Sequence, residues 1–258
     1  MFANLYALGV YYFQGFFCEE TDMKELLNQI VENLSFIAVC AALVVGLFLV
    51  AKLSERKLPL HTVSKARRVS IIGICSALAA VLHMLDFPLL FLAPDFYKLD
   101  FSELPVMLCG FFLGPSATVA CEGIKILLKL LLKGTSTAFV GDFANFAVGC
   151  SLVLPAVMIY HLRKSRKSAL IGLMVGTLAL TVFGSAFNAI YLLPKFAQLY
   201  GIPLDAIIGM GSAIHASISD VTSFVLLCVA PLNLIKGLMI SVLTLLLYKR
   251  VARPLFGK

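Results

Sequence analysis

Apolar segments long enough to cross a lipid bilayer are the feature that most constrains this chain. Of its 258 residues, 60% are hydrophobic and only 14% are charged, and the mean hydropathy is +0.98. A soluble domain is about 45–50% apolar and about 25% charged, whereas one helical span needs about 20 apolar residues. The composition therefore predicts an all-α integral membrane protein without a sizeable soluble domain.

The positions of the apolar runs predict six core transmembrane helices plus one additional N-terminal transmembrane helix. The additional span is 34–53, and the core runs are 69–85, 106–113, 117–132, 143–160, 169–193 and 231–248. We expect Pro194 to end the fifth core helix and Pro231 to begin the sixth, because proline disrupts a helix interior. The predicted domains are 1–65, with an irregular arm (1–33), the extra helix and a basic linker, and 66–258, the six-helix membrane domain.

Basic residues predict how the chain is oriented in the membrane. Five Lys/Arg lie in 54–68, four in 161–167 and four in 249–258. The predicted spans place all three segments on one side, which is cytoplasmic by the positive-inside rule. The C-terminus is then cytoplasmic and the N-terminus extracellular. The net charge of +7 needs no nucleic-acid partner, because it reflects these membrane-flanking segments.

Polar residues inside or beside apolar spans are costly and indicate a functional site. At 1.5 Å per helical residue, Asp100, Asn145, Asn188, Asn233 and Lys236 are all predicted in the outer third of the bundle. Asn offers a donor and an acceptor and Lys offers donors, which suits a ligand carrying hydroxyls or carbonyls. Two alternatives stay open: Asn145 could join helices, and Lys236 could extend to the outer interface.

The sequence carries no pattern that points to catalysis. It has no nucleophile–base arrangement, no phosphate-binding loop and no metal-ligand spacing, so we expect no catalytic residue, metal or resident cofactor. The seven cysteines are interpreted as packing residues, Glu122 and Lys125 as a structural pair, and His83 and His215 as packing or loop residues. An intramembrane enzyme is the alternative class.

The segment YKLDFSELP at 97–105 resembles the first outer loop of riboflavin-specific S components of energy-coupling factor (ECF) vitamin transporters. PLNLIKG at 231–237 is the second specific match, and the resemblance covers about 66–250. It implies a riboflavin site on the outer side. Leu99, Asp100 and Phe101 would cap the ligand, and Asn188, Asn233 and Lys236 would hold its polar groups.

The resemblance also implies partners, namely a transmembrane coupling protein and two cytosolic ATPases in the plasma membrane of a bacterium. Small residues on the first core helix would face the coupling protein, although packing inside the bundle is the alternative: Gly73, Ser76, Ala77, Ala79 and Ala80. Riboflavin would be the transported ligand, not a cofactor. The alternatives are an S component for another vitamin or a flavin analogue (FMN, roseoflavin), or a solitary ion-coupled secondary transporter.

Overall fold

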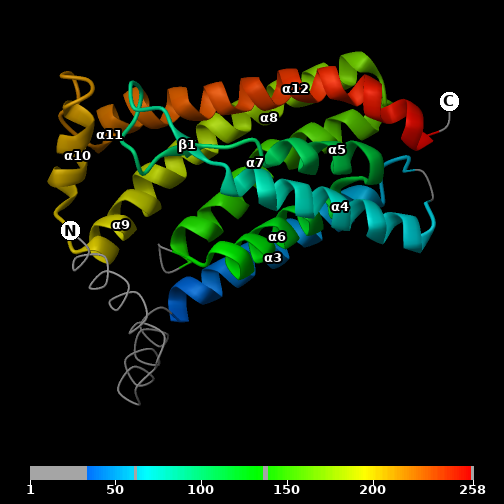
Figure 1. Ribbon diagram of the computed structural model, residues 1–258, viewed down its shortest axis with the longest axis horizontal. Coiled ribbons are helices and arrows are strands. Elements are labelled where there is room, and N and C mark those ends of the chain that lie inside the picture. The colour runs from blue at the N-terminus through cyan, green and yellow to red at the C-terminus, as the bar shows by residue number, and fades with distance from the viewer. Residues whose placement is uncertain (1–33, 61–62, 136–138, 257–258) are drawn as a thin grey trace, which may run out of the picture. The chain divides into compact units, whose positions relative to one another are not determined.

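The computed structural model describes residues 34–60, 63–135 and 139–256, so the arm predicted over 1–33 lies outside the described residues. The chain divides after Val45, and the account below concerns the unit Gly46–Lys258. Over these described ranges the fold is all-α apart from one short strand pair (Figure 1). Its elements are α3 (Leu34–Glu55), α4 (Lys65–Met84), β1 (Phe87–Pro88), β2 (Lys98–Leu99), α5 (Glu103–Leu113), α6 (Pro115–Lys133), α7 (Val140–Arg163), α8 (Arg166–Phe187), η1 (Asn188–Leu192), α9 (Leu193–Tyr200), α10 (Leu204–Ser212), α11 (Val221–Phe224), η2 (Val225–Val229) and α12 (Ala230–Phe256).

Four helical stretches among the described residues are long and apolar enough to cross a membrane. They are Lys65–Met84, Val140–Arg163, Arg166–Tyr200 and Val221–Tyr248. Helix α5 is apolar but has only 11 residues, and α6 carries four charged side chains along its length. At 1.5 Å per residue α5 is about 16 Å long, which is too short to cross a bilayer by itself.

The expectation that Pro194 ends one helix and Pro231 begins another was wrong. Helix α8 continues through η1 into α9, and α11 continues through η2 into α12. In both places one residue separates a five-residue π turn from the proline, namely Leu193 before Pro194 and Ala230 before Pro231. The N–H of Leu193 bonds to the carbonyl of Asn188, and the N–H of Ala230 bonds to that of Val225.

The two prolines explain the π turns physically. A proline lacks the N–H that an α-helix needs, and its ring collides with the carbonyl four residues earlier. A widened turn just before the ring moves that carbonyl away from it. The backbone there forms hydrogen bonds five residues apart instead of four, and the helix continues past the proline. Such π turns are frequent at functional sites, and η1 and η2 lie against each other in this fold.

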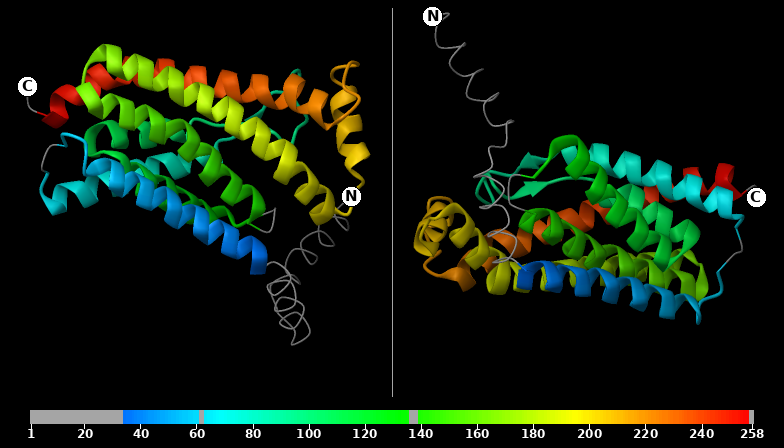
Figure 2. Two further views of the ribbon diagram at one scale, coloured as in Figure 1. Left: turned by 180° about the vertical axis from the view of Figure 1, so that it is seen from behind. Right: turned by 90° about the horizontal axis from the view of Figure 1, so that it is seen from below.

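The bundle is held by close helix contacts around a central α5. Helix α8 lies between α7 and α12, while α4 and α6 pack together on the other side of α5 (Figures 1 and 2). On α8, a Cβ at Gly172 would lie 2.6 Å from the carbonyl oxygen of Ala156, and one at Gly176 would overlap that of Leu152. Glycines four residues apart thus let α7 and α8 approach closely, as small residues do in membrane bundles.

The basic segments lie at one end of this unit, as predicted. The start of α4, the α7–α8 turn and the C-terminal part of α12 occupy the same end (Figure 1). There Glu55 accepts a hydrogen bond from the backbone N–H of Ser116 (2.9 Å), which caps α6, and Arg68 lies 3.7 Å from Glu55. The opposite end carries the β1–β2 segment, η1, η2 and the polar residues considered next.

Candidate ligand-binding cavity

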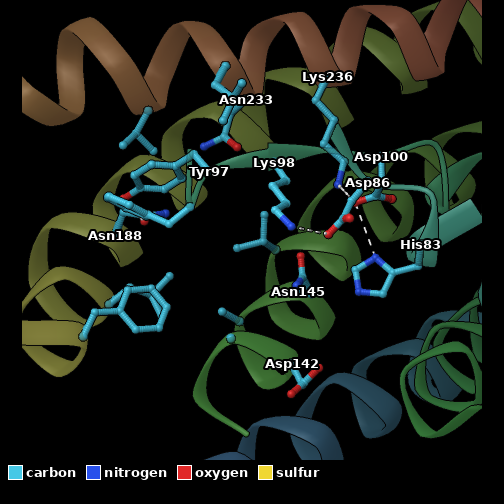
Figure 3. Close-up of a pocket in the computed structure, with 18 of the residues that line it drawn as sticks. His83, Asp86, Tyr97, Lys98, Asp100, Asp142, Asn145, Asn188, Asn233 and Lys236 are labelled. Carbon is cyan, nitrogen blue, oxygen red and sulfur yellow. Dashed lines mark hydrogen bonds and ion pairs between the residues drawn. The ribbon is translucent and has the colours of Figure 1, made fainter. Parts of the chain in front are cut away.

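A cavity of about 440 Å³ opens between the β1–β2 segment and the ends of α4, α6, α7, η1, α9 and α12 (Figure 3). Its lining is mostly polar, with a minority of aromatic and aliphatic side chains. The charged or titratable lining residues are His83, Asp86, Asp95, Lys98, Asp100, Lys129, Lys133, Asp142 and Lys236; the amides are Asn145, Asn188 and Asn233; and the aromatic residues are Phe96, Tyr97, Phe196 and Tyr200.

The structure brings together the five polar residues that were placed at one depth from the sequence. Asp100, Asn145, Asn188, Asn233 and Lys236 all line this cavity, although they come from a loop and three different helical segments. A bundle places them together because the ends of α7, α8 and α12 meet at the same level. The cavity therefore has the convergent polar groups that a small-molecule site needs.

The other two residues expected in the cap, Leu99 and Phe101, do not line the cavity. Leu99 is buried and pairs with Phe87 across the β1–β2 ladder, and the Phe101 ring lies 6.1 Å from the ring of Phe87. Both residues thus pack against Phe87 of β1 and not toward the cavity. Between them, Asp100 turns inward, since its Oδ1 accepts a 2.8 Å hydrogen bond from the backbone N–H of Ser102.

The two cavity amides Asn188 and Asn233 differ in their hydrogen bonding. The hydroxyl of Tyr97 donates to Asn188 Oδ1 (2.7 Å), and Asn188 Nδ2 donates to the carbonyl of Gly184 (2.8 Å). Asn233 is 9% exposed, and its buried Nδ2 has no hydrogen-bond partner among the described residues. A Cβ at Gly184 would lie 2.7 Å from Asn233 Nδ2, so glycine there leaves room for this amide.

Lys236 does not extend to the outer interface. It is 8% exposed, and its Nζ lies 3.1 Å from Asp100 Oδ2 and 3.1 Å from Glu103 Oε2. Burial alone would raise the pKa of Asp100, but the Lys236 ammonium, aided by His83 and Lys125, holds the pKa of this loop carboxyl well below its ordinary value. The two groups are thus a buried ion pair at the inner wall of the cavity.

Sequence reasoning missed several residues of this region, among them His83, Tyr97 and Glu103. His83, interpreted as a packing or loop residue, lines the cavity with Nδ1 3.4 Å from Asp100 Oδ2. Tyr97 and Glu103 belong to the YKLDFSELP segment but were assigned no role. The resemblance gave the signal for these two, because they flank Leu99–Phe101, whereas a lone His83 on an apolar helix gave none.

Ion pairs connect the loop to the helices around the mouth. Asp86 Oδ2 lies 3.5 Å from Lys98 Nζ, and Asp86 Oδ1 lies 3.6 Å from Lys133 Nζ on α6. Lys129 on α6 pairs with Asp142 on α7 at 2.5 Å. The first two pairs are partly exposed, and exposed pairs contribute about 0–1 kcal/mol each. They therefore help to position the loop but contribute little to the stability of the protein.

Comparison with known proteins identifies the family. The family of ECF transporter substrate-specific components matches residues 67–248. The chain belongs to this family. It is 34% identical over 187 residues to a riboflavin transporter RibU of Staphylococcus aureus, covering 72% of this chain and 90% of that protein. It is 30% identical over 185 residues to the riboflavin transporter FmnP of Bacillus subtilis, covering 71% and 91%.

A solved structure agrees with the family assignment. It is described as the S component of a bacterial ECF transporter, and it shares 35% identity and a TM-score of 0.59 with this chain, covering 74% of this chain and 99% of its own. The chain is therefore a multi-pass membrane protein with the S-component fold. The interpretation as a transport subunit is confirmed, and that of an intramembrane enzyme is set aside, because this family is one of transport components.

Proposed function

We propose that this chain is the riboflavin-binding subunit of an ECF importer and captures riboflavin from outside the cell. The observation that carries the proposal is the buried Nδ2 of Asn233, which has no partner within the described part of the chain and lies in a cavity that also presents Asn188 and Lys236. A buried donor without a partner costs about 1–3 kcal/mol. A ligand with a hydrogen-bond acceptor at that point would recover this cost.

Riboflavin has the chemistry that this cavity can accept. Its flat ring carries carbonyls and an N–H, and its ribityl chain carries hydroxyls. Amides can both donate to and accept from such groups, and the aromatic residues Phe96, Tyr97 and Phe196 can contact the ring. The cavity volume of about 440 Å³ falls within the 300–1,000 Å³ common for small-molecule sites. Relatives whose names state riboflavin transport support the same ligand.

The proposed arrangement in the membrane follows the basic residues. Helices α4, α6, α7, α8–α9 and α12 cross the membrane, α5 is a sixth core segment that extends only part of the way across, and α3 is the additional transmembrane helix. The end that carries the α7–α8 turn and the C-terminus faces the cytoplasm, by the positive-inside rule. The cavity then opens outward, where a vitamin would be captured, and the N-terminus is extracellular.

The proposed partners are a transmembrane coupling protein and two cytosolic ATPases. Of the five small residues considered for docking, Ser76, Ala79 and Ala80 are buried against the bundle, whereas Gly73 and Ala77 are exposed on one face of α4. A Cβ at Gly73 would meet no atom within 4 Å. We therefore place the docking face at Gly73 and Ala77, where a partner helix could approach closely.

Purification of the full chain tests the ligand directly. The protein should carry, or bind on addition, riboflavin with a flavin absorbance and quenched fluorescence. A preparation that stays colourless and binds no added riboflavin would refute the proposal. Competition with FMN, roseoflavin and unrelated vitamins separates a riboflavin subunit from an S component for another ligand. Uptake by vesicles that contain this chain alone would instead support an ion-coupled transporter.

The docking face needs its own test. Gly73→Leu and Ala77→Leu should abolish riboflavin uptake in cells while leaving riboflavin binding by the purified protein unchanged. Leu78 is also exposed on α4 and serves as the control, because Leu78→Ile changes neither size nor polarity. Normal uptake by both leucine variants would exclude this face as the docking site.

A further inference from the structure

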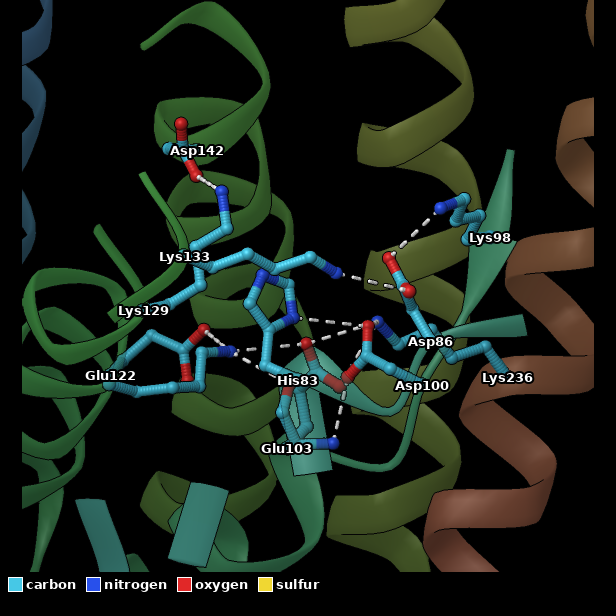
Figure 4. A network of polar contacts seen from close by, with 12 residues as sticks. His83, Asp86, Lys98, Asp100, Glu103, Glu122, Lys129, Lys133, Asp142 and Lys236 are labelled. Atoms are coloured by element: carbon cyan, nitrogen blue, oxygen red, sulfur yellow. Dashed lines mark hydrogen bonds and ion pairs between the residues drawn. The ribbon is translucent and has the colours of Figure 1, made fainter. Parts of the chain in front are cut away.

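Six ionisable side chains form a buried cluster beneath the cavity, here called the floor cluster: His83, Asp100, Glu103, Glu122, Lys125 and Lys236 (Figure 4). They come from α4, the β2–α5 loop, α5, α6 and α12. Buried charges are costly unless they are paired, so a cluster of this size must be held by its internal contacts. Only three members, His83, Asp100 and Lys236, line the cavity itself.

Glu103 occupies the centre of the floor cluster. Its Oε1 lies 3.1 Å from Lys236 Nζ and 3.4 Å from Lys125 Nζ, and its Oε2 lies 3.1 Å from Lys236 Nζ. Glu103 is buried and does not line the cavity. It therefore touches Lys236, which lines the cavity, without itself having access to the ligand.

The partners of Glu103 hold it in place from below. Lys125 is fully buried, pairs with Glu122 and donates to the hydroxyl of Ser102 at 3.1 Å. This confirms the intrahelical Glu122–Lys125 pair predicted from the sequence and adds Glu103 to it. Because Lys125 is fixed on two sides, its ammonium gives the Glu103 carboxylate a defined position between the two lysines.

The ammonium of Lys236 can donate only a few hydrogen bonds, so the groups that accept them decide which N–H points into the cavity. An ammonium has three N–H groups, and here Asp100 and Glu103 accept from Lys236. With these two directions occupied, the remaining donor is available to the cavity. Without the Glu103 carboxylate, the ammonium would be held by Asp100 alone and could turn or shift toward it.

We propose that Glu103 is a positioning residue for ligand binding: it fixes the ammonium of Lys236 so that one donor faces a polar group of the ligand. This inference rests on the proposed function, since the ligand used to test it is riboflavin. It assigns a binding role to a carboxylate that never meets the ligand. The floor cluster is then part of the site's recognition chemistry as well as of its stability.

Charge balance makes Glu103→Gln an informative variant. The cluster contains three carboxyls and two lysines, so removing one carboxylate leaves Lys236 paired with Asp100 and Lys125 paired with Glu122. No buried lysine is left alone, and Gln has nearly the same shape as Glu. The variant should therefore fold, and its effect on riboflavin binding can be measured.

A double-mutant cycle in the full-length protein tests the proposal. Riboflavin affinity is measured by fluorescence quenching for wild type, Glu103→Gln, Lys236→Gln and the double variant, at concentrations that saturate the weakest binder. We expect Glu103→Gln to weaken binding at least tenfold in the wild-type background and less than twofold in the Lys236→Gln background. Residues that act through one another are non-additive, whereas a general loss of packing would weaken both backgrounds alike.

The outcomes separate the inference from the proposed function. If wild type binds riboflavin but Glu103→Gln binds within twofold of it, or weakens both backgrounds equally, the positioning role is refuted and the proposed function stands. If wild type binds no riboflavin, the proposed function itself fails. Should Glu103→Gln not fold, Glu103→Asp replaces it: the shifted carboxylate should cause a smaller, still non-additive loss, and additivity would refute the role.

A carboxylate at the other end of the unit provides the matched control. Glu55 pairs with Arg68 and caps α6 far from the cavity. Glu55→Gln therefore removes a partly buried carboxylate without touching the floor cluster, and riboflavin affinity should be unchanged. A loss of affinity equal to that of Glu103→Gln would show that any lost carboxylate weakens binding, and would refute the positioning role.

Discussion

The hydroxyl of Tyr97 donates a 2.7 Å hydrogen bond to Oδ1 of Asn188, which joins the loop between β1 and β2 to the first residue of the π turn η1. A loop side chain thereby reaches across the cavity to a helix that starts 69 residues later, at Arg166. Since Asn188 Nδ2 already donates to Gly184, this contact fixes both ends of the amide. The orientation of Asn188, a proposed ligand-binding residue, thus depends on the position of the loop that carries Tyr97.

Replacement of Tyr97 by Phe should weaken the attachment of this loop to η1. The change removes one hydrogen bond and leaves Asn188 Oδ1 without a donor, which costs about 1 kcal/mol. We expect riboflavin to dissociate about three- to tenfold faster, measured by stopped-flow fluorescence. Tyr200→Phe is the control, because Tyr200 also lines the cavity but is 52% exposed. Equal dissociation rates for the wild type and Tyr97→Phe would contradict the prediction.

Replacement of Asn233 by Leu should separate stability from binding. Leu has a similar size and removes the buried Nδ2, to which no described residue offers a hydrogen bond. We therefore expect the ligand-free protein to be as stable as wild type or more stable, by up to about 1–3 kcal/mol, whereas riboflavin binds at least tenfold more weakly. Thermal unfolding without riboflavin and a binding titration measure the two effects. A less stable empty protein would show that Asn233 is structural.

Replacement of Gly149 by Ala should disturb the floor cluster from α7. A Cβ at Gly149 would overlap Glu122 Oε1 and lie 3.4 Å from Glu103 Oε1. We expect a loss of about 1–3 kcal/mol in the free energy of unfolding, since overpacking forces side chains from their positions. Gly123→Ala on α6 is the control, as its Cβ would meet only Phe146 at 3.8 Å. Similar melting temperatures for the two variants would be inconsistent with this picture.

Replacement of Asp100 by Asn should change how stability depends on pH. In the folded protein the pKa of Asp100 is held below its ordinary value by Lys236, despite burial. Its contribution is therefore present above the unfolded pKa of about 3.9 and is lost as the pH falls through the lower folded value. Asp100→Asn should be less stable than wild type by about 2 kcal/mol near pH 7.

The difference between the two proteins should shrink as the pH is lowered below about 4, where the Asp100 carboxyl of the unfolded wild-type chain begins to take up a proton that the folded protein does not yet bind. Thermal unfolding in detergent across this range measures it. A difference that stays constant with pH would show that Asp100 stabilises the protein by shape or hydrogen bonding, not by its charge.

The sequence alone determined the class of this protein and predicted one common level for its polar residues. Helical spans in a bilayer satisfy their own backbone hydrogen bonds, so each apolar run is a local signal, and runs such as 143–160 and 117–132 correspond closely to α7 and α6. Asn188, Asn233 and Lys236 could be placed at one level by counting residues, because a helix rises by a constant 1.5 Å per residue.

Only the tertiary structure decided how these groups interact. The continuation of helices through Pro194 and Pro231 depends on π turns packed against each other, which no local rule predicts. The sharing of Glu103 between Lys125 and Lys236 joins three helices, since charges buried in a bundle must find partners wherever the fold brings them. The polar residues for which the sequence predicts one level line a single cavity, and the paired charges of the floor cluster lie beneath it.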